Sequence, residues 1–114
     1  MTRCLILEDK PEDASALGAM LGTHGLHWER ASGAEAALAR LGEVEPELIV
    51  IPEARADLLG RIRRVPHAGK VIVYSEKPDA IAMGRHIRDG AAECLVKPFD
   101  ADVLEWKLRQ VGIL

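Results

Sequence analysis

Short strand-like runs, of which the second (residues 26–31) is weaker and more polar than the others, alternate with helix-like patterns five times along this chain of 114 residues. The runs are too short for helices and are bounded by charged or turn-forming residues, as buried strands are. Strands alternating with helices form parallel sheets with helices on both faces. The sequence therefore predicts an α/β fold with a doubly wound five-stranded parallel sheet. Strands are expected at residues 4–7, 26–31, 48–51, 71–74 and 93–96, and helices at 12–23, 33–41, 55–64, 78–89 and 101–111.

Particular residues mark the limits and the surroundings of these elements. Ser32 is a good N-cap for the second helix, and Glu35 follows at the spacing of a capping box. Gly90 follows the fourth helix, where a glycine commonly ends a helix. The third apolar run, residues 48–51, is continuous rather than alternating, which indicates a central strand covered on both faces.

The composition is that of an ordinary globular protein, with 48% hydrophobic and 29% charged residues. We expect residues 1–114 to form a single domain with a substantial core. The formal net charge of −3 favours neither nucleic acid nor an anionic membrane as a partner. No apolar run approaches the roughly 20 residues that span a bilayer. Cys4 and Cys94 lie far apart in apolar runs, which indicates reduced core thiols and a cytoplasmic location.

Charged and polar residues follow four of the five expected strands. Parallel strands end at one edge of the sheet, and ligands of such folds gather there. We therefore expect a site at this edge, with acids, a hydroxyl and a lysine as its polar groups. The residues in question are Glu8-Asp9 after the first strand, Pro52-Glu53 after the third, Ser75 after the fourth and Lys97-Pro98-Phe99 after the fifth.

In this order and on these strands, the motifs resemble the response-regulator receiver family, whose flavodoxin-like fold is also called CheY-like. The resemblance covers nearly the whole chain and is greatest over residues 89–100. It implies that Glu8 and Asp9 match the acidic pair that holds Mg²⁺, an ion that prefers oxygen ligands. It also implies that Ser75 hydrogen-bonds a phosphoryl group, that Lys97 neutralises it, and that Pro98 follows a cis peptide bond.

Three departures from the receiver pattern affect the chemistry that the resemblance implies. Pro52 stands at the phospho-acceptor position, and proline has no side-chain oxygen for nucleophilic attack. The connection from Glu53 to Arg55 is shorter than the usual loop, which gives a backbone carbonyl to the metal, and Cys94 replaces an aromatic switch residue. We therefore expect a pseudo-receiver that accepts no phosphate, has no catalytic residue and is not an enzyme. Mg²⁺ is not expected as a cofactor, and the acidic pair is only a weak candidate for metal ligation.

Two nearby acids are alternatives to the missing acceptor. Glu53 directly follows Pro52, but successive strand residues point to opposite sides, so Glu53 should aim away from the acidic pair unless the chain bends. Such a bend is compatible with Pro52, which removes a donor from the strand ladder. Asp57 lies in the expected third helix, where a solvent-facing position is the simpler interpretation. Without an acceptor, the acidic pair is a solvated strand end with Lys97 as its ion-pair partner.

A second function is suggested by basic residues in and between the third and fourth helices. Arginines beside an aromatic ring hold nucleotides by bidentate and stacking contacts, and degenerate receivers that bind cyclic dinucleotides are known. The alternative is thus a ligand-sensing domain for a cyclic dinucleotide of the cyclic di-GMP type, while a solvated basic helix face is the simpler interpretation. The candidate residues are Arg61, Arg63, Arg64, Tyr74, Arg85 and Arg88.

The pseudo-receiver interpretation predicts a protein partner, such as a histidine kinase or another signalling domain of a bacterial two-component system. Receivers commonly bind partners through the fourth and fifth helices and the fifth strand, where the candidate interface residues are Cys94, Pro98, Phe99 and Trp106. Trp106 lies off the apolar stripe of its helix, which favours an exposed position. The histidines show no metal-ligand spacing and are interpreted as surface or loop residues: His24, His27, His67 and His86.

Overall fold

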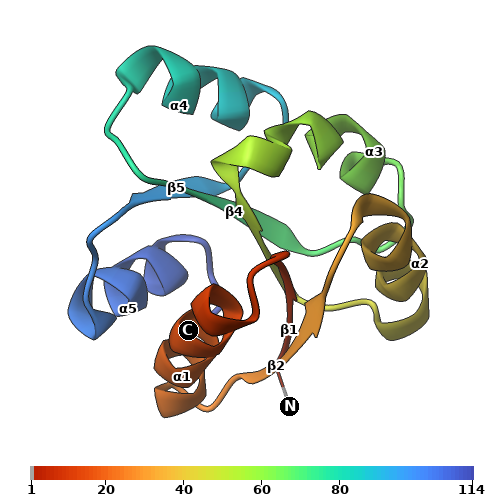
Figure 1. The fold of residues 1–114 in the computed structure, drawn as a ribbon, viewed down its shortest axis with the longest axis horizontal. Coiled ribbons are helices and arrows are strands. Elements are labelled where there is room, and N and C mark those ends of the chain that lie inside the picture. The colour runs from red at the N-terminus through yellow and green to blue at the C-terminus, as the bar shows by residue number, and fades with distance from the viewer. Residues whose placement is uncertain (1) are drawn as a thin grey trace.

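The computed structural model describes residues 2–114 as a sheet between two layers of helices (Figure 1). The elements in chain order are β1 (Arg3–Leu7), α1 (Pro11–Thr23), β2 (His27–Ala31), α2 (Ala34–Val44), β3 (Leu48–Pro52), the 3₁₀ helix η1 (Glu53–Leu58), α3 (Leu59–Arg63), β4 (Lys70–Ser75), α4 (Ala80–Arg88), β5 (Glu93–Val96) and α5 (Ala101–Gln110). The strands pair in parallel in the order β2-β1-β3-β4-β5. The predicted doubly wound five-stranded parallel sheet is therefore confirmed.

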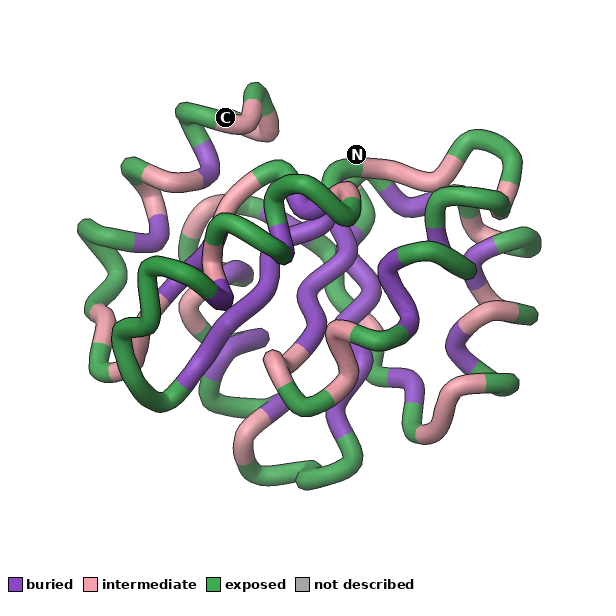
Figure 2. Tube along the Cα trace, turned by 90° about the horizontal axis from the view of Figure 1, so that it is seen from above, coloured by how far each residue is buried: buried purple, intermediate pink, exposed green. Residues whose placement is uncertain are grey.

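The sheet is buried because helices cover both of its faces. α1 and α5 lie on one face, and α2, α3 and α4 lie on the other (Figure 1). Buried residues follow the strands through the centre of the molecule, and exposed residues lie on the outer sides of the helices (Figure 2). Residues 4–7 of β1 and residues 48–51 of β3 are continuously apolar and buried because each strand meets helices on both sides.

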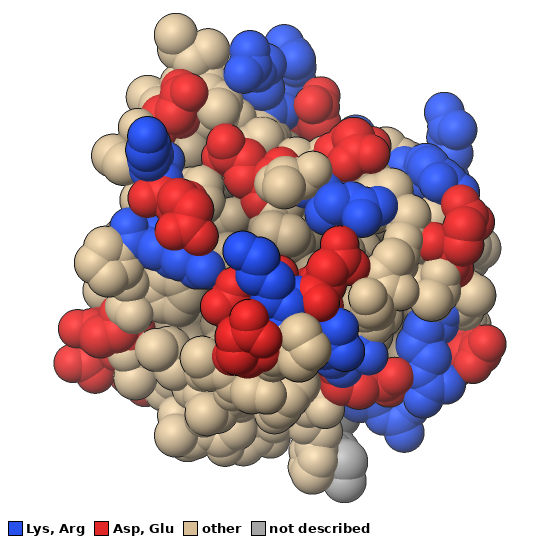
Figure 3. All heavy atoms as spheres, in the orientation of Figure 1, with Lys and Arg blue, Asp and Glu red and all other residues tan. Residues whose placement is uncertain are grey.

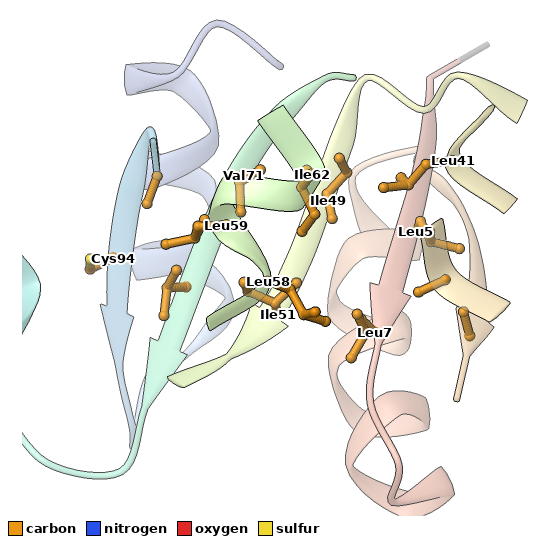
Figure 4. Packing of buried hydrophobic residues seen from close by; sticks show 14 residues of the cluster. Leu5, Leu7, Leu41, Ile49, Ile51, Leu58, Leu59, Ile62, Val71 and Cys94 are labelled. Atoms are coloured by element: carbon orange, nitrogen blue, oxygen red, sulfur yellow. The ribbon is translucent and has the colours of Figure 1, made fainter. Parts of the chain in front are cut away.

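Two hydrophobic clusters fill the spaces between the sheet and its helices. Alternate strand residues point to opposite faces, so Leu5 enters one cluster and Ile6 the other. Figure 4 shows the cluster beneath α2 and α3, where Leu59 and Ile62 of α3 meet Ile49 and Val71 of the sheet. The other cluster joins the sheet to α1 and α5 and includes Leu17, Leu21, Tyr74, Leu104 and Leu108.

The surface carries charges of both signs. On the face viewed in Figure 3, acidic and basic side chains are interspersed rather than gathered by sign. Within residues 2–114, no helix is long and apolar enough to cross a membrane. Both cysteines are buried thiols, and burial raises the pKa of Cys4 to about 12.

The predicted capping box of α2 is wrong. Gly33, with φ 86°, is the N-cap, and no side chain caps the helix. Ser32 instead donates its hydroxyl to Asp9 Oδ1 at 3.2 Å, and the Gly33 N–H donates to the same oxygen at 3.1 Å. The carboxylate after β1 thus takes the hydroxyl that would otherwise cap the helix.

The helices around β4 differ from the predicted ranges. The expected helix at residues 55–64 is a 3₁₀ helix followed by a short α3, and Arg55 interrupts it with φ −113° and ψ 18°. α4 begins at Ala80 because Asp79 caps it, its carboxylate accepting the Ala82 N–H at 3.0 Å. The chain therefore leaves β3 through a tight 3₁₀ turn that brings Arg55 close to the end of the sheet.

Candidate functional site

The carboxyl edge of the sheet holds a cavity of about 330 Å³. Its lining includes the ends of β1, β3, β4 and the start of the β5–α5 connection, so the structure brings together the site residues suggested by the sequence. The lining consists of Glu8, Asp9, Lys10, Asp13, Pro52, Glu53, Ala54, Arg55, Tyr74, Ser75, Glu76 and Lys97.

The acidic pair is engaged by groups of the chain itself. Asp9 Oδ1 accepts the two bonds from Ser32 and Gly33, and Asp9 Oδ2 lies 3.7 Å from Arg55 Nη1. Glu8 is buried, and its Oε1 accepts the Lys10 N–H at 3.2 Å. Neither carboxylate therefore stands as an unengaged ligand at the mouth of the cavity.

Arg30 of β2 fixes the backbone that carries the acidic pair. Its Nε donates to the Glu8 carbonyl at 2.8 Å, and its Nη2 donates to the Asp9 carbonyl at 3.0 Å. Sequence reasoning missed both Arg30 and Arg55 as site residues. The available signal for Arg30 was its place on the strand that pairs with β1, opposite Ile6.

The acceptor position at the end of β3 holds no carboxylate. Pro52 is the last residue of the strand, pairs in register with Tyr74 and lines the cavity. Glu53 lies at the same cavity, because η1 begins immediately and turns the chain. Its Oε2, however, lies 3.5 Å from Nε2 of His86 on α4. Asp57 is exposed and lies 4.0 Å from Arg55 Nε, as a solvent-facing aspartate would.

His86 corrects the interpretation of the histidines as surface or loop residues. It is a buried residue on the inner face of α4, next in that face to Ala82. Within residues 2–114, neither His86 Nε2 nor Glu53 Oε2 has a hydrogen-bond partner, although the two atoms face each other. The carboxylate that directly follows Pro52 is thus directed toward α4 rather than toward the acidic pair.

Lys97 does not pair with the acidic pair, which contradicts the expected ion pair. Its Nζ lies 3.2 Å from Glu76 Oε1 and 5.0 Å from the centre of the Tyr74 ring. Ser75 donates its hydroxyl to the Lys77 carbonyl at 3.3 Å. The Lys97–Pro98 peptide bond is cis, as predicted.

The acidic pair is the element that would hold the Mg²⁺ implied by the receiver resemblance. That ion is usually bound through one or two carboxylates, with waters completing a near-octahedral arrangement. Within residues 2–114, no three His, Cys, Asp or Glu side chains converge on a common point as metal ligands do. Asp9 and Glu8 instead accept donors of the chain, and Arg55 lies beside Asp9, so the pair as it stands does not fit the ion.

The structure separates Tyr74 from the arginines of the suggested nucleotide surface. Tyr74 is 5% exposed and belongs to the cluster beneath α1 and α5, across the sheet from α3. The expected surface, in which the Tyr74 ring lies beside the arginines, therefore does not form. The five arginines are exposed, and three of them have local partners. Arg61 lies 2.9 Å from Glu35, Arg63 lies 3.5 Å from the Asp89 carbonyl, and Arg88 lies 3.6 Å from the Asp89 carboxylate. Arg64 and Arg85 have no ion pair within residues 2–114.

The suggested interface residues divide into buried and exposed members. Cys94 is 3% exposed, so it cannot form part of a contact surface; burial, with Glu93 as the second cause, raises the pKa of its thiol. Trp106 is 56% exposed, and its ring lies 5.3 Å from Lys107 Nζ. Pro98 and Phe99 line a second cavity of about 250 Å³ between α1 and the β5–α5 connection.

Comparisons with known proteins agree with this geometry. The model of the response regulator receiver domain family matches residues 4–109. No curated protein sequence matches the chain. NtrX from Brucella abortus, solved with ADP, has 24% identity and a TM-score of 0.83 over 99% of this chain, which spans only 28% of the NtrX chain.

Two further solved structures are similar over nearly their full length. The beryllofluoride-activated NtrC4 receiver domain dimer has 24% identity and a TM-score of 0.86, covering 99% of this chain and 98% of that one. CheY4 from Vibrio cholerae has 19% identity and a TM-score of 0.88, covering 97% and 98%. At such identities the structural similarity shows only that the fold is shared. The family model, in contrast, matches most of the sequence and shows the family. The chain belongs to the response regulator receiver domain family of two-component signalling.

Proposed function

We propose that this chain is a non-phosphorylatable pseudo-receiver that works by binding another signalling protein. The observation that carries the proposal is Pro52, which ends β3 at the cavity where the acidic pair, Ser75 and Lys97 meet. A phospho-acceptor must present a nucleophilic oxygen at that place, and proline has none. At this position the chain therefore lacks the nucleophilic acceptor that phosphoryl transfer in this family requires.

The contacts around Pro52 support the same proposal. Asp9 is turned toward Ser32, Gly33 and Arg55, and Lys97 is turned toward Glu76. Cys94 is too short and too buried to swing between an inward and an outward position. The residues expected to bind the metal, to neutralise the phosphoryl group and to act as the conformational switch all have other contacts or lack the needed size. These features support a protein that keeps the receiver fold without the phosphorylation reaction.

The partner surface that we propose consists of α4, β5 and α5. β5 ends the strand order and leaves one side without a neighbouring strand, which suits contact with another protein. Ile87 is 46%, Val103 41% and Trp106 56% exposed on the helices that flank it. Contiguous apolar patches mark protein contacts, and we propose that these side chains form one. The similar NtrC4 receiver was solved as a dimer. A histidine kinase or another receiver-type domain is the class of partner that we propose.

Beryllofluoride, which mimics a phosphoryl group on an acceptor carboxylate, tests the proposal. We expect the backbone amide NMR signals of Ser75, Lys97 and Cys94 to stay unchanged when beryllofluoride and Mg²⁺ are added. A salt-matched titration without beryllofluoride is the control. Saturable shifts of these signals would contradict the proposal, and their loss in Glu53→Gln would then assign the substitute acceptor to Glu53, which lines the cavity.

No observation favours the cyclic dinucleotide alternative. The aromatic ring that would stack on the ligand lies across the sheet from the arginines that would hold its phosphates. Arg61 and Arg88 already face acidic side chains at 2.9 Å and 3.6 Å. The protein-binding role therefore remains the function that we propose.

A further inference from the structure

Arg55 lies in the cavity beside the acidic pair. It follows β3 by only a few residues, and its backbone leaves helical geometry within η1. Its side chain is 27% exposed and lines the cavity beside the acidic pair. Nη1 lies 3.7 Å from Asp9 Oδ2, and Nε lies 4.0 Å from Asp57 Oδ1. One guanidinium thus lies between the carboxylate after β1 and a carboxylate of η1.

The charges that line the cavity are predominantly acidic. The acids that line it outnumber the basic residues, and of the basic residues Lys97 is already paired with Glu76. Lys10 approaches Glu8 through its backbone N–H. Arg55 is therefore the cation directed at Asp9. The lining acids are Glu8, Asp9, Asp13, Glu53 and Glu76, and the basic residues are Lys10, Arg55 and Lys97.

We infer that Arg55 is a tethered cation that takes the place of a divalent metal at the carboxyl edge of the sheet. The inference rests on the proposed function, because it explains how the acidic cavity persists without metal or phosphate. A guanidinium stays charged at every physiological pH and binds carboxylates through a planar set of donors. Because it belongs to the chain, its effective concentration at Asp9 is high, and a dissolved ion must compete with it.

The contact also fixes the arrangement of two connections. Arg55 joins η1 to the turn after β1, and Arg30 holds the same turn from the side of β2. The edge of the sheet is thereby bridged from β2 to the segment after β3 by two arginines of the chain. This arrangement makes the conformation of the cavity independent of Mg²⁺, in contrast to a site that must recruit an ion.

Removal of the charge at Arg55 tests the inference with Mn²⁺ as the probe, because this ion broadens NMR signals of nearby amides. In the unaltered protein we expect no saturable broadening at Asp9, Glu53 or Ser75. In Arg55→Gln we expect saturable loss of these signals, because the acids then lack their internal cation. Arg61→Gln, which removes an exposed arginine paired with Glu35, is the matched control and should behave like the unaltered protein.

Two further variants test whether the charge at Arg55 and the carboxylate of Asp9 are the groups responsible. Arg55→Lys keeps the charge and should stay insensitive to Mn²⁺, and adding Asp9→Asn to Arg55→Gln should abolish the gained broadening. Equal Mn²⁺ broadening in the unaltered protein and Arg55→Gln, or none in a folded Arg55→Gln, would overturn the inference. The Mn²⁺ experiments use no beryllofluoride. The role of Arg55 and the proposed function can therefore be contradicted separately, the first by Mn²⁺ broadening and the second by beryllofluoride-induced shifts.

Discussion

Leu59→Ala should lower the free energy of unfolding by about 3 kcal/mol, the middle of the range for truncating a buried leucine. Leu59 is 1% exposed and begins α3, which has only five residues. So short a helix is held by packing rather than by its own hydrogen bonds. The lost contacts are with the cluster in Figure 4, which also holds Leu58 and Ile62. Urea denaturation followed by circular dichroism measures the change.

Ile81→Ala is the matched control for this prediction. Ile81 is 76% exposed on α4, so its truncation should change the free energy of unfolding by no more than about 0.5 kcal/mol. Similar losses in the two variants would contradict the packing that the structure assigns to α3. The comparison also bears on the site, because α3 anchors the segment that carries Arg55.

Gly18→Ala should destabilise the protein by about 2 kcal/mol, although alanine is the better helix former. Trp28 of β2 lies flat against α1 where Gly18 has no side chain. A Cβ there would lie 2.1 Å from Trp28 Cε2, so the indole must move away from the helix. The cost of that displacement exceeds the gain of up to about 1 kcal/mol from helix propensity. Thermal and urea unfolding measure the net effect.

Gly22→Ala in the same helix should have the opposite sign. No atom lies within 4 Å of a Cβ built on Gly22, so the substitution keeps the helix-propensity gain of up to about 1 kcal/mol. In a Trp28→Ala background, Gly18→Ala should lose its cost because the colliding ring is gone. Stabilisation by Gly18→Ala in the unaltered background would show that Trp28 does not pack on α1 as described.

Four of the strands were predictable because each is largely an apolar run, whereas β2 (His27–Ala31) is mostly polar and was predictable from its place in the alternation. The start of α2 was not predictable from its local pattern. Ser32 has the chemistry of an N-cap, but Asp9, distant in sequence, lies close enough to accept its hydroxyl. The 3₁₀ turn after Pro52 was missed for a related reason, since a helical pattern alone does not distinguish 3₁₀ from α geometry.

At the site, the positions were predictable and the partners were not. The strands of a parallel sheet end at one edge, which places Glu8, Ser75 and Lys97 there, and a parallel sheet follows from the alternation of strands and helices. Partner choice depends on how far long side chains reach across the sheet. Arg55 reaches Asp9 and Lys97 reaches Glu76 instead of the acidic pair. The burial of His86 against Glu53 likewise depends on the rotation of α4, which a short amphipathic pattern does not fix.

Intact mass spectrometry after incubation with acetyl phosphate and Mg²⁺ measures whether this chain, with Pro52 at the end of β3, can accept a phosphoryl group. A receiver with an acceptor aspartate, treated in parallel, shows that the reagent is active. We expect a single unmodified mass for this chain at every time point. A species heavier by one phosphoryl group, lost on treatment with hydroxylamine as an acyl phosphate is, would contradict it.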